Sequence, residues 1–278
     1  MVDFIGIGAQ RCGTSWIYGC LYEHPEICAP MKEIHFFSRP RYEKGLPWYE
    51  SHFKKCSPDQ KIGEFSTSYL YTEGTAKKIQ DAYPDTKLIA VIRNPIDRAV
   101  SQYWNAVKAG EVQKSVTVDD YLKQEKSALE QGFYARQLKE YFDVFEKNQI
   151  LVLVYDDAKT DPEGYIKKIY TFLGVDADFK PSMLHDNINV SRVPHSVGVE
   201  KNMHVFAEWM RKIGLDKVVH IVRKSGLPDL VRRFNTKEER KNQKSEMDES
   251  ALTQYFREDV AELSKLIERD LASLWHIR

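Results

Sequence analysis

The sequence predicts an α/β fold with a central parallel sheet that helices cover on both faces. Four short apolar runs are typical of buried strands, at residues 2–7, 61–65, 87–92 and 150–154, and longer stretches with helical periodicity separate them. Strands that alternate with helices in this way form parallel sheets. The 278 residues contain no internal repeat and no low-complexity linker, so we expect one domain over residues 1–278.

The expected helices follow from apolar spacing and capping residues. The turn after the first strand leads into a helix that stops near His24 and Pro25. After the third strand, Asn94 suits the N-cap and Pro95 the first helical position. Three further helices are expected: one that carries Tyr134 and Phe145, one that Asp161-Pro162 opens and Gly174 closes, and a final helix over about residues 249–275.

Composition excludes several classes of protein. Lys plus Arg number 41 and Asp plus Glu number 41, and a chain without basic excess is unlike a general nucleic-acid binder. No stretch approaches the length of apolar sequence that spans a membrane. The four cysteines have no CxxC spacing and the first residues have no basic leader, so we expect reduced thiols, a cytoplasmic protein and no metal site.

The pattern weakens after Pro181. Basic residues outnumber acidic ones from Arg223 to Lys244, within a segment of about residues 223–246 that we expect to be basic and mobile. A solvated face is the simpler interpretation of this segment. A lid over an anionic acceptor is the alternative.

The loop after the first strand has the composition of an anion site. Gly8 and Gly13 have the GxxxxG spacing of a Walker A loop, but Thr14 stands where that motif needs lysine. Glycines let backbone N–H groups approach a phosphate, the following helix N-terminus attracts anions, and Arg11 adds a full charge. Without the lysine, the loop suits an anion less charged than a triphosphate.

Two further groups of residues could carry chemistry. Arg93 ends the third strand and Ser101 lies about two turns into the next helix, so both could face one phosphate at the edge of the sheet. Glu33 and His35 lie two positions apart, which puts both side chains on one side of an extended segment. Either could take a proton from an acceptor hydroxyl.

In this order and spacing, the motifs resemble those of the sulfotransferases that use 3′-phosphoadenosine 5′-phosphosulfate (PAPS), most closely the branch of heparan-sulfate and bacterial enzymes. The matching segments are GAQRCGTS at 8–15, KEIHFF at 32–37, GLPWY at 45–49, GEFSTSY at 63–69, RNPIDRAVS at 93–101, GFYARQL at 132–138, NVSRVP at 189–194 and the last helix near Trp275. The resemblance implies a P-loop NTPase-like sulfotransferase fold in a single domain.

The resemblance also assigns roles to individual residues. It implies that PAPS is the co-substrate and 3′-phosphoadenosine 5′-phosphate (PAP) the product, with no metal. It makes Glu33 the catalytic base, with His35 as the second candidate, and Arg11 a catalytic cation. The implied nucleotide-binding residues are Arg11, Cys12, Gly13, Thr14, Ser15, Trp16, Arg93, Ser101, Tyr134 and Arg192.

Two positions depart from the family pattern. Arg11 stands where most members carry lysine, and Phe65 stands where the polysaccharide-sulfating members carry lysine after the glutamate. The second departure argues against a polyanionic acceptor. We expect in-line transfer to a hydroxyl, or less favourably an amine, of a saccharide or small molecule, and the aromatic residues at 36–37, 48–49, 69 and 71 fit either a sugar ring or an apolar product, unless they belong to the core.

Two alternative functions stay open from the sequence. A P-loop kinase or NTPase would need lysine at position 14 and an acidic magnesium ligand after a later strand, but the third strand ends in Arg93. A non-catalytic nucleotide-binding module could keep the same fold. A homo-oligomer is neither indicated nor excluded.

Overall fold

The computed structural model describes residues 2–113, 115–185, 193–194, 236–237 and 249–277. Their contacts divide the chain into two compact units. The first comprises residues 1–99, 127–189 and 249–278, and the second comprises residues 100–126 and 190–248. A single domain over the whole chain stays a prediction.

The first unit contains a five-stranded parallel sheet with the strand order β2-β3-β1-β4-β5. The strands are β1 (Phe4–Gly8), β2 (Ile27–Cys28), β3 (Lys61–Phe65), β4 (Lys87–Ile92) and β5 (Ile150–Val154). The four predicted strands are confirmed, and three of them have the predicted bounds. The two residues of β2 were too short a run for apolar patterning to reveal.

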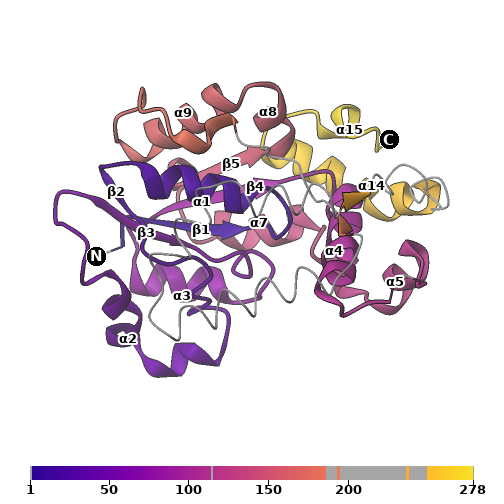
Figure 1. The fold of residues 1–278 in the computed structure, drawn as a ribbon, viewed down its shortest axis with the longest axis horizontal. Helices are drawn as coiled ribbons and strands as arrows, with labels where there is room; N and C mark the ends of the chain where they lie inside the picture. The colour runs from indigo at the N-terminus through magenta and orange to yellow at the C-terminus, as the bar shows by residue number, and fades with distance from the viewer. Residues whose placement is uncertain (1, 114, 186–192, 195–235, 238–248, 278) are drawn as a thin grey trace. The chain divides into compact units, whose positions relative to one another are not determined.

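Helices cover both faces of this sheet. The α-helices described in this unit are α1 (Thr14–Glu23), α2 (Leu46–Glu50), α3 (Thr75–Ala82), α6 (Ser127–Glu130), α7 (Tyr134–Phe142), α8 (Tyr155–Thr160), α9 (Pro162–Leu173), α14 (Glu249–Leu266) and α15 (Leu271–Leu274). Four short 3-10 helices lie at Pro40–Lys44, Ser51–Phe53, Lys147–Gln149 and Ser182–His185. Figure 1 shows α8 and α9 on one side of the sheet and α3 on the other.

Tyrosine hydroxyls and close glycine contacts fix the layers. Tyr170 of α9 donates a hydrogen bond to the Cys20 carbonyl of α1 at 3.0 Å, and Tyr141 of α7 donates to the Tyr69 carbonyl at 2.8 Å. A Cβ on Gly6 would lie 2.1 Å from the ring of Phe65. The aromatic ring can therefore pack directly on the backbone of the neighbouring strand, because that position has no side chain.

The predicted helix signals act as expected at two sites. Asn94 Oδ1 accepts hydrogen bonds from the N–H groups of Ile96 at 2.9 Å and Asp97 at 3.3 Å, and α4 (Pro95–Ala109) begins with the expected proline. Asp161 caps α9 through the N–H of Gly164 at 2.8 Å, and Gly174 ends it with a φ of 76°.

Three predictions from the sequence are wrong. The helix expected to carry both Tyr134 and Phe145 ends at Phe142, so Phe145 lies beyond α7. The single final helix is two helices, because Glu268 has a φ of 56° and Asp270 caps α15 through the N–H of Ser273. The thiols are not all reduced, because Cys28 at the end of β2 forms a disulfide with Cys56, while Cys12 and Cys20 are free and buried. The cytoplasmic location stays a prediction.

The second unit contains most of α4, together with α5 (Val118–Gln124), β6 (Val193–Pro194) and β7 (Thr236–Lys237). The two short strands pair antiparallel, and Thr117 caps α5 through the N–H of Asp120 at 3.1 Å. Most of the basic 223–246 segment lies outside the described residues. No helix in the described part of the chain is long and apolar enough to cross a membrane.

Candidate functional site

The 8–15 loop leaves β1 at its carboxyl end and leads directly into α1. Gly13 occupies the N-cap with a φ of 82°, where a Cβ would lie 2.4 Å from the ring of Tyr155. Only glycine therefore fits this position, both for its conformation and for its contacts. No side chain caps the helix, so the N-terminus of α1 presents its partial positive charge to an anion.

Arg93 joins this loop from the end of β4. Its Nη1 donates a hydrogen bond to the Arg11 carbonyl at 3.4 Å, and its guanidinium lies 5.1 Å from the ring of Tyr155. Its Nε is buried and has no hydrogen-bond partner within the described residues. A buried donor of this kind is normally satisfied, so this atom fits an anionic ligand that the protein itself does not supply.

The other predicted nucleotide-binding residues lie in or beneath the loop. Cys12 and Tyr134 are both buried, with 3.7 Å between Sγ and the hydroxyl. Burial raises the pKa of both groups, so both keep their protons at neutral pH. Trp16 donates from Nε1 to the Met183 carbonyl at 2.9 Å, and Thr14 is buried. These four side chains therefore support the loop from inside the protein.

Two predicted ligands cannot be placed with the others. Ser101 is buried in α4, in the part of that helix that belongs to the second unit. Arg192 lies outside the described residues. The predicted roles of both stay predictions.

Glu33 and His35 lie together in the segment that follows β2. The two side chains are 3.0 Å apart, from Glu33 Oε2 to His35 Nε2. The Glu33 carboxylate also accepts hydrogen bonds from the backbone N–H of Thr67 at 3.0 Å and from its hydroxyl at 3.0 Å. Those donors fix the carboxylate, yet its side chain is 31% exposed against 14% for His35. Glu33 is therefore the more accessible of the two candidate bases.

Lys32 connects the two parts of the site. Its Nζ donates a hydrogen bond to Ser15 Oγ at 2.9 Å and lies 3.4 Å from Glu33 Oε1. Sequence reasoning assigned no role to this lysine, although it directly precedes Glu33 in the matched motif. It brings an ammonium group to the N-terminus of α1, where Thr14 takes the place of the lysine that a Walker A loop would have.

Burial changes the protonation behaviour of this cluster. It lowers the pKa of Lys32 and of His35, and the charge of Glu33 opposes both shifts. His35 is therefore neutral at pH 7, with Nδ1 2.5 Å from Ser68 Oγ. A neutral imidazole beside an accessible carboxylate can orient that carboxylate, and the carboxylate can take a proton from a hydroxyl.

The carboxyl edge of the sheet thus gathers three cationic side chains, a helix N-terminus and a fixed carboxylate. The cations are Arg11, Lys32 and Arg93. No group of three or more His, Cys, Asp or Glu side chains that could hold a metal ion occurs within the described ranges. Such a site can bind an anionic ester and deprotonate a nearby acceptor.

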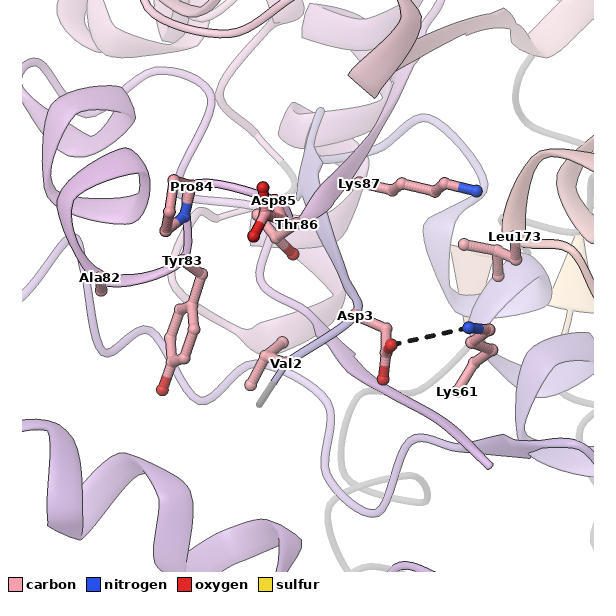
Figure 2. A pocket seen from close by; sticks show the side chains of 10 residues that line it. All are labelled: Val2, Asp3, Lys61, Ala82, Tyr83, Pro84, Asp85, Thr86, Lys87 and Leu173. Carbon is pink, nitrogen blue, oxygen red and sulfur yellow. Dashed lines mark ion pairs between the residues drawn. The ribbon is translucent and has the colours of Figure 1, made fainter. Parts of the chain in front are cut away.

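A cavity lies at the opposite edge of the sheet (Figure 2). It has a volume of about 240 Å³ and is lined by Val2, Asp3, Lys61, Ala82, Tyr83, Pro84, Asp85, Thr86, Lys87 and Leu173. These residues surround the amino ends of β1, β3 and β4. In parallel sheets, ligands bind at the carboxyl ends, so the cavity is separate from the candidate site.

Comparisons with known proteins agree with this geometry. The sulfotransferase domain family matches residues 2–267. Human heparan sulfate glucosamine 3-O-sulfotransferase 6 is 31% identical over 175 residues, which cover 61% of this chain and 51% of that protein. The chain spans about half the length of this relative.

Solved structures match over more of the chain. A sulfotransferase from Alicyclobacillus acidocaldarius is 27% identical, with a TM-score of 0.71 over 99% of both chains. The sulfotransferase domain from the curacin biosynthetic pathway shares the fold at 14% identity, with a TM-score of 0.51 over 67% of this chain and 79% of that one. The predicted fold is confirmed, and the chain belongs to the sulfotransferase domain family.

Proposed function

We propose that this protein transfers the sulfuryl group of PAPS to a hydroxyl group of a saccharide or small-molecule acceptor. One observation carries the proposal: Lys32 Nζ lies 2.9 Å from Ser15 Oγ and 3.4 Å from Glu33 Oε1. A cation and a candidate base therefore lie beside the 8–15 loop, which supports its proposed role in binding the anionic donor. A hydroxyl acceptor agrees with the 3-O-sulfotransferase activity named for the human relative.

PAPS has two separate anionic ends, and the site offers two separate groups of cations and N–H groups that can bind them. The 8–15 loop, with Arg11 and the N-terminus of α1, would bind the 5′-phosphosulfate. Arg93 would bind the 3′-phosphate, because its buried Nε has no partner in the described part of the chain. The role that the resemblance gives to Ser101 stays a separate prediction, because that residue belongs to the second unit.

The proposed reaction forms a bond between the acceptor oxygen and sulfur while the bond from sulfur to the bridging phosphate oxygen breaks. The acceptor proton passes to Glu33, and the bonding electrons pass to PAP. Arg11 and Lys32 would stabilise the negative charge that develops on the bridging oxygen. Preorganised donors of this kind are worth about 3 kcal/mol each in a dry site.

We assign the base to Glu33 and the orienting role to His35. Glu33 is held by two donors of Thr67, while His35 is engaged on both ring nitrogens, by Glu33 and by Ser68. The resemblance left the choice open between these residues. The geometry favours the carboxylate because it is the more exposed group and is already fixed.

The acceptor is proposed to be uncharged. Phe65, at the position where polysaccharide-sulfating members carry lysine, is fully buried against Gly6 and offers no cation. Most of the aromatic residues that the sequence suggested for the acceptor are also buried in the core. These are Phe36, Phe37, Tyr49 and Tyr69.

Calorimetry with PAP and with ATP plus magnesium tests the donor half of this proposal. We expect PAP to bind and ATP with magnesium to bind much more weakly. A screen with ³⁵S-labelled PAPS over neutral saccharides, heparan sulfate, phenols, aliphatic alcohols and amines tests the acceptor half. Absence of heat with PAP would contradict the proposal, and so would tight binding of ATP with magnesium together with its hydrolysis.

A further inference from the structure

A buried carboxyl group lies in β3, three positions before Thr67, the residue that holds the candidate base. Glu64, in β3, is fully buried, and it takes part in no ion pair that the described residues form. Three hydroxyl groups donate to it: Ser66 at 2.6 Å, Tyr69 at 2.5 Å and Tyr49 at 3.3 Å. Nothing in the proposed reaction uses this carboxyl group, although a buried carboxyl is costly to maintain.

Two of the three hydroxyls also bind the backbone of residues 33–36, the segment that carries the candidate base. Ser66 Oγ accepts a hydrogen bond from the backbone N–H of His35 at 2.9 Å, and the Tyr69 hydroxyl accepts one from the N–H of Phe36 at 2.9 Å. A hydroxyl has one proton to donate. Because each of these two hydroxyls donates its proton to Glu64, its oxygen is left to accept one backbone N–H. Ser66 accepts that of His35, and Tyr69 accepts that of Phe36.

The segment that these bonds hold has an unfavourable backbone. Glu33 has a φ of 60° and His35 a φ of 53°, both in the left-handed region that side chains other than glycine rarely adopt. Such conformations persist only where the surroundings hold them. The hydroxyls of Ser66 and Tyr69 hold His35 and the following residue, Phe36.

We propose that Glu64 is a positioning residue, which fixes the 33–36 backbone through the hydroxyls of Ser66 and Tyr69 and so orients the Glu33 carboxylate. The catalytic part of this inference rests on the proposed function of Glu33. Glu64 touches neither donor nor acceptor. Its effect is to hold the base in the geometry that transfer requires.

The chain offers a matched pair of tyrosines to test this. Tyr69→Phe removes a hydroxyl that donates to Glu64 and also accepts the N–H of Phe36. Tyr49→Phe removes a hydroxyl that donates to the same carboxyl group and contacts no backbone N–H of the segment. Both rings are fully buried and both substitutions keep the ring. Glu64→Gln is the third variant. Ser66 donates to Oε2 of Glu64 and Tyr69 to Oε1, and an amide replaces one of these two acceptor oxygens with an NH₂ donor.

Amide hydrogen exchange and turnover are measured together at pH 8, above the pKa of about 7 to which burial raises Glu64, so that the group is a carboxylate. In Tyr69→Phe, the N–H of Phe36 should exchange at least about 10-fold faster, and turnover of labelled PAPS with the best acceptor of the screen should fall about 10- to 100-fold, since a misplacement of about 1 Å can cost that much. In Glu64→Gln, exchange at His35 or Phe36 should rise similarly. The Kd for PAP should change less than about twofold in all three variants, and Tyr49→Phe should match the wild type.

The outcomes separate the two claims. Unchanged exchange at His35 and Phe36 in both Tyr69→Phe and Glu64→Gln would overturn the positioning role, whatever the activity. Equal losses of turnover in Tyr69→Phe and Tyr49→Phe would overturn it too, because both would then act through general destabilisation. If Glu64→Gln does not fold, the tyrosine pair decides. A wild-type protein that never consumes PAPS would remove the proposed function and leave the exchange result to judge the backbone network.

Discussion

The two ends of β4 place similar side chains in different situations. Lys87 begins the strand, and its ammonium group donates to the Phe172 carbonyl at 2.5 Å and lies 5.3 Å from the ring of Phe172. Arg93 follows the strand and lies 5.1 Å from the ring of Tyr155, yet its Nε is buried with no partner in the described ranges. Arg93 also pairs with Asp97 at 3.7 Å and donates to the Arg11 carbonyl, so the two cations differ in this one nitrogen, Nε, which fits an external anion.

The two edges also differ in which residues adopt left-handed backbone angles. Arg11, Glu33 and His35 all have left-handed backbone angles at the carboxyl edge, and two other non-glycine residues described with such angles, Glu268 and His276, flank α15. At the amino edge, the left-handed position that ends α9 is occupied by Gly174. Three of the five described non-glycine residues with left-handed angles thus lie at the proposed site, where such conformations are common.

The largest expected effect is that of removing the base at the carboxyl edge. Glu33→Gln should lower turnover by about 10² to 10⁴, the usual contribution of a general base. The Kd for PAP should stay nearly unchanged, because Glu33 is proposed to act on the acceptor hydroxyl and not to bind the nucleotide. Turnover with labelled PAPS and calorimetry with PAP measure the two effects.

Asp3→Asn is the matched control at the amino edge. Asp3 Oδ2 accepts the backbone N–H of Ile62 at 2.9 Å, as Glu33 accepts that of Thr67 at 3.0 Å. Turnover in this variant should equal that of the wild type. Near-normal turnover in Glu33→Gln would instead move the role of base to His35.

The next effect compares the two cations of β4. Arg93→Ala should weaken PAP binding by roughly 10- to 100-fold, the value of charge-assisted hydrogen bonds to a phosphate. Adenosine 5′-monophosphate, which has no 3′-phosphate, should bind both proteins almost equally. Lys87→Ala should leave PAP binding as it is. Equal losses for both nucleotides would contradict the role of Arg93, and calorimetry decides.

Two glycines with the same backbone conformation provide the third comparison. Gly174→Ala should lower the free energy of unfolding by about 1–2 kcal/mol, the cost of a left-handed alanine. No steric cost adds to this, because the new Cβ would point into open space. Gly13→Ala adds a collision with Tyr155 and should also abolish measurable PAP binding. Chemical denaturation and calorimetry measure these effects. Retained PAP binding in Gly13→Ala would show that the loop is not the anion site.

Local signals explain which parts of this structure the sequence predicts. The strands β4 and β5 are nearly continuous apolar runs, and the caps Asn94 and Asp161 act within one helical turn, so pattern alone finds them. The break before α15 depends on the left-handed Glu268, and the Cys28–Cys56 disulfide depends on residues 28 positions apart. Neither is a local property of the sequence.

The candidate site shows the same limit. The 8–15 loop and the pair Glu33 and His35 are visible as motifs, because each lies within a few residues. The contact of Lys32 with Ser15 crosses 17 positions, and that of His35 with Ser66 crosses 31. Such contacts depend on the order of strands in the sheet, which apolar patterning does not specify.

The smallest expected effect is a pH dependence that belongs to the carboxyl edge. Burial raises the pKa of Glu64 from 4.5 to about 7, against the hydrogen bonds of Ser66, Tyr69 and Tyr49, which lower it, and with a further rise from the charge of Glu33. Between these pKa values the folded protein keeps a proton that the unfolded chain releases, so the free energy of unfolding falls as pH rises through this window.

From pH 6 to pH 7 the Glu64 contribution should fall by about 1 kcal/mol, below the limit of about 1.4 kcal/mol per pH unit for one proton. Glu64→Gln should remove this part of the slope. Asp259, whose pKa burial raises to about 6, contributes its own fall in both proteins and therefore cancels. Urea denaturation of both proteins at pH 6, 7 and 8 measures the difference. Parallel curves would mean that Glu64 is ionised throughout, and that its hydroxyl donors outweigh the cost of its burial.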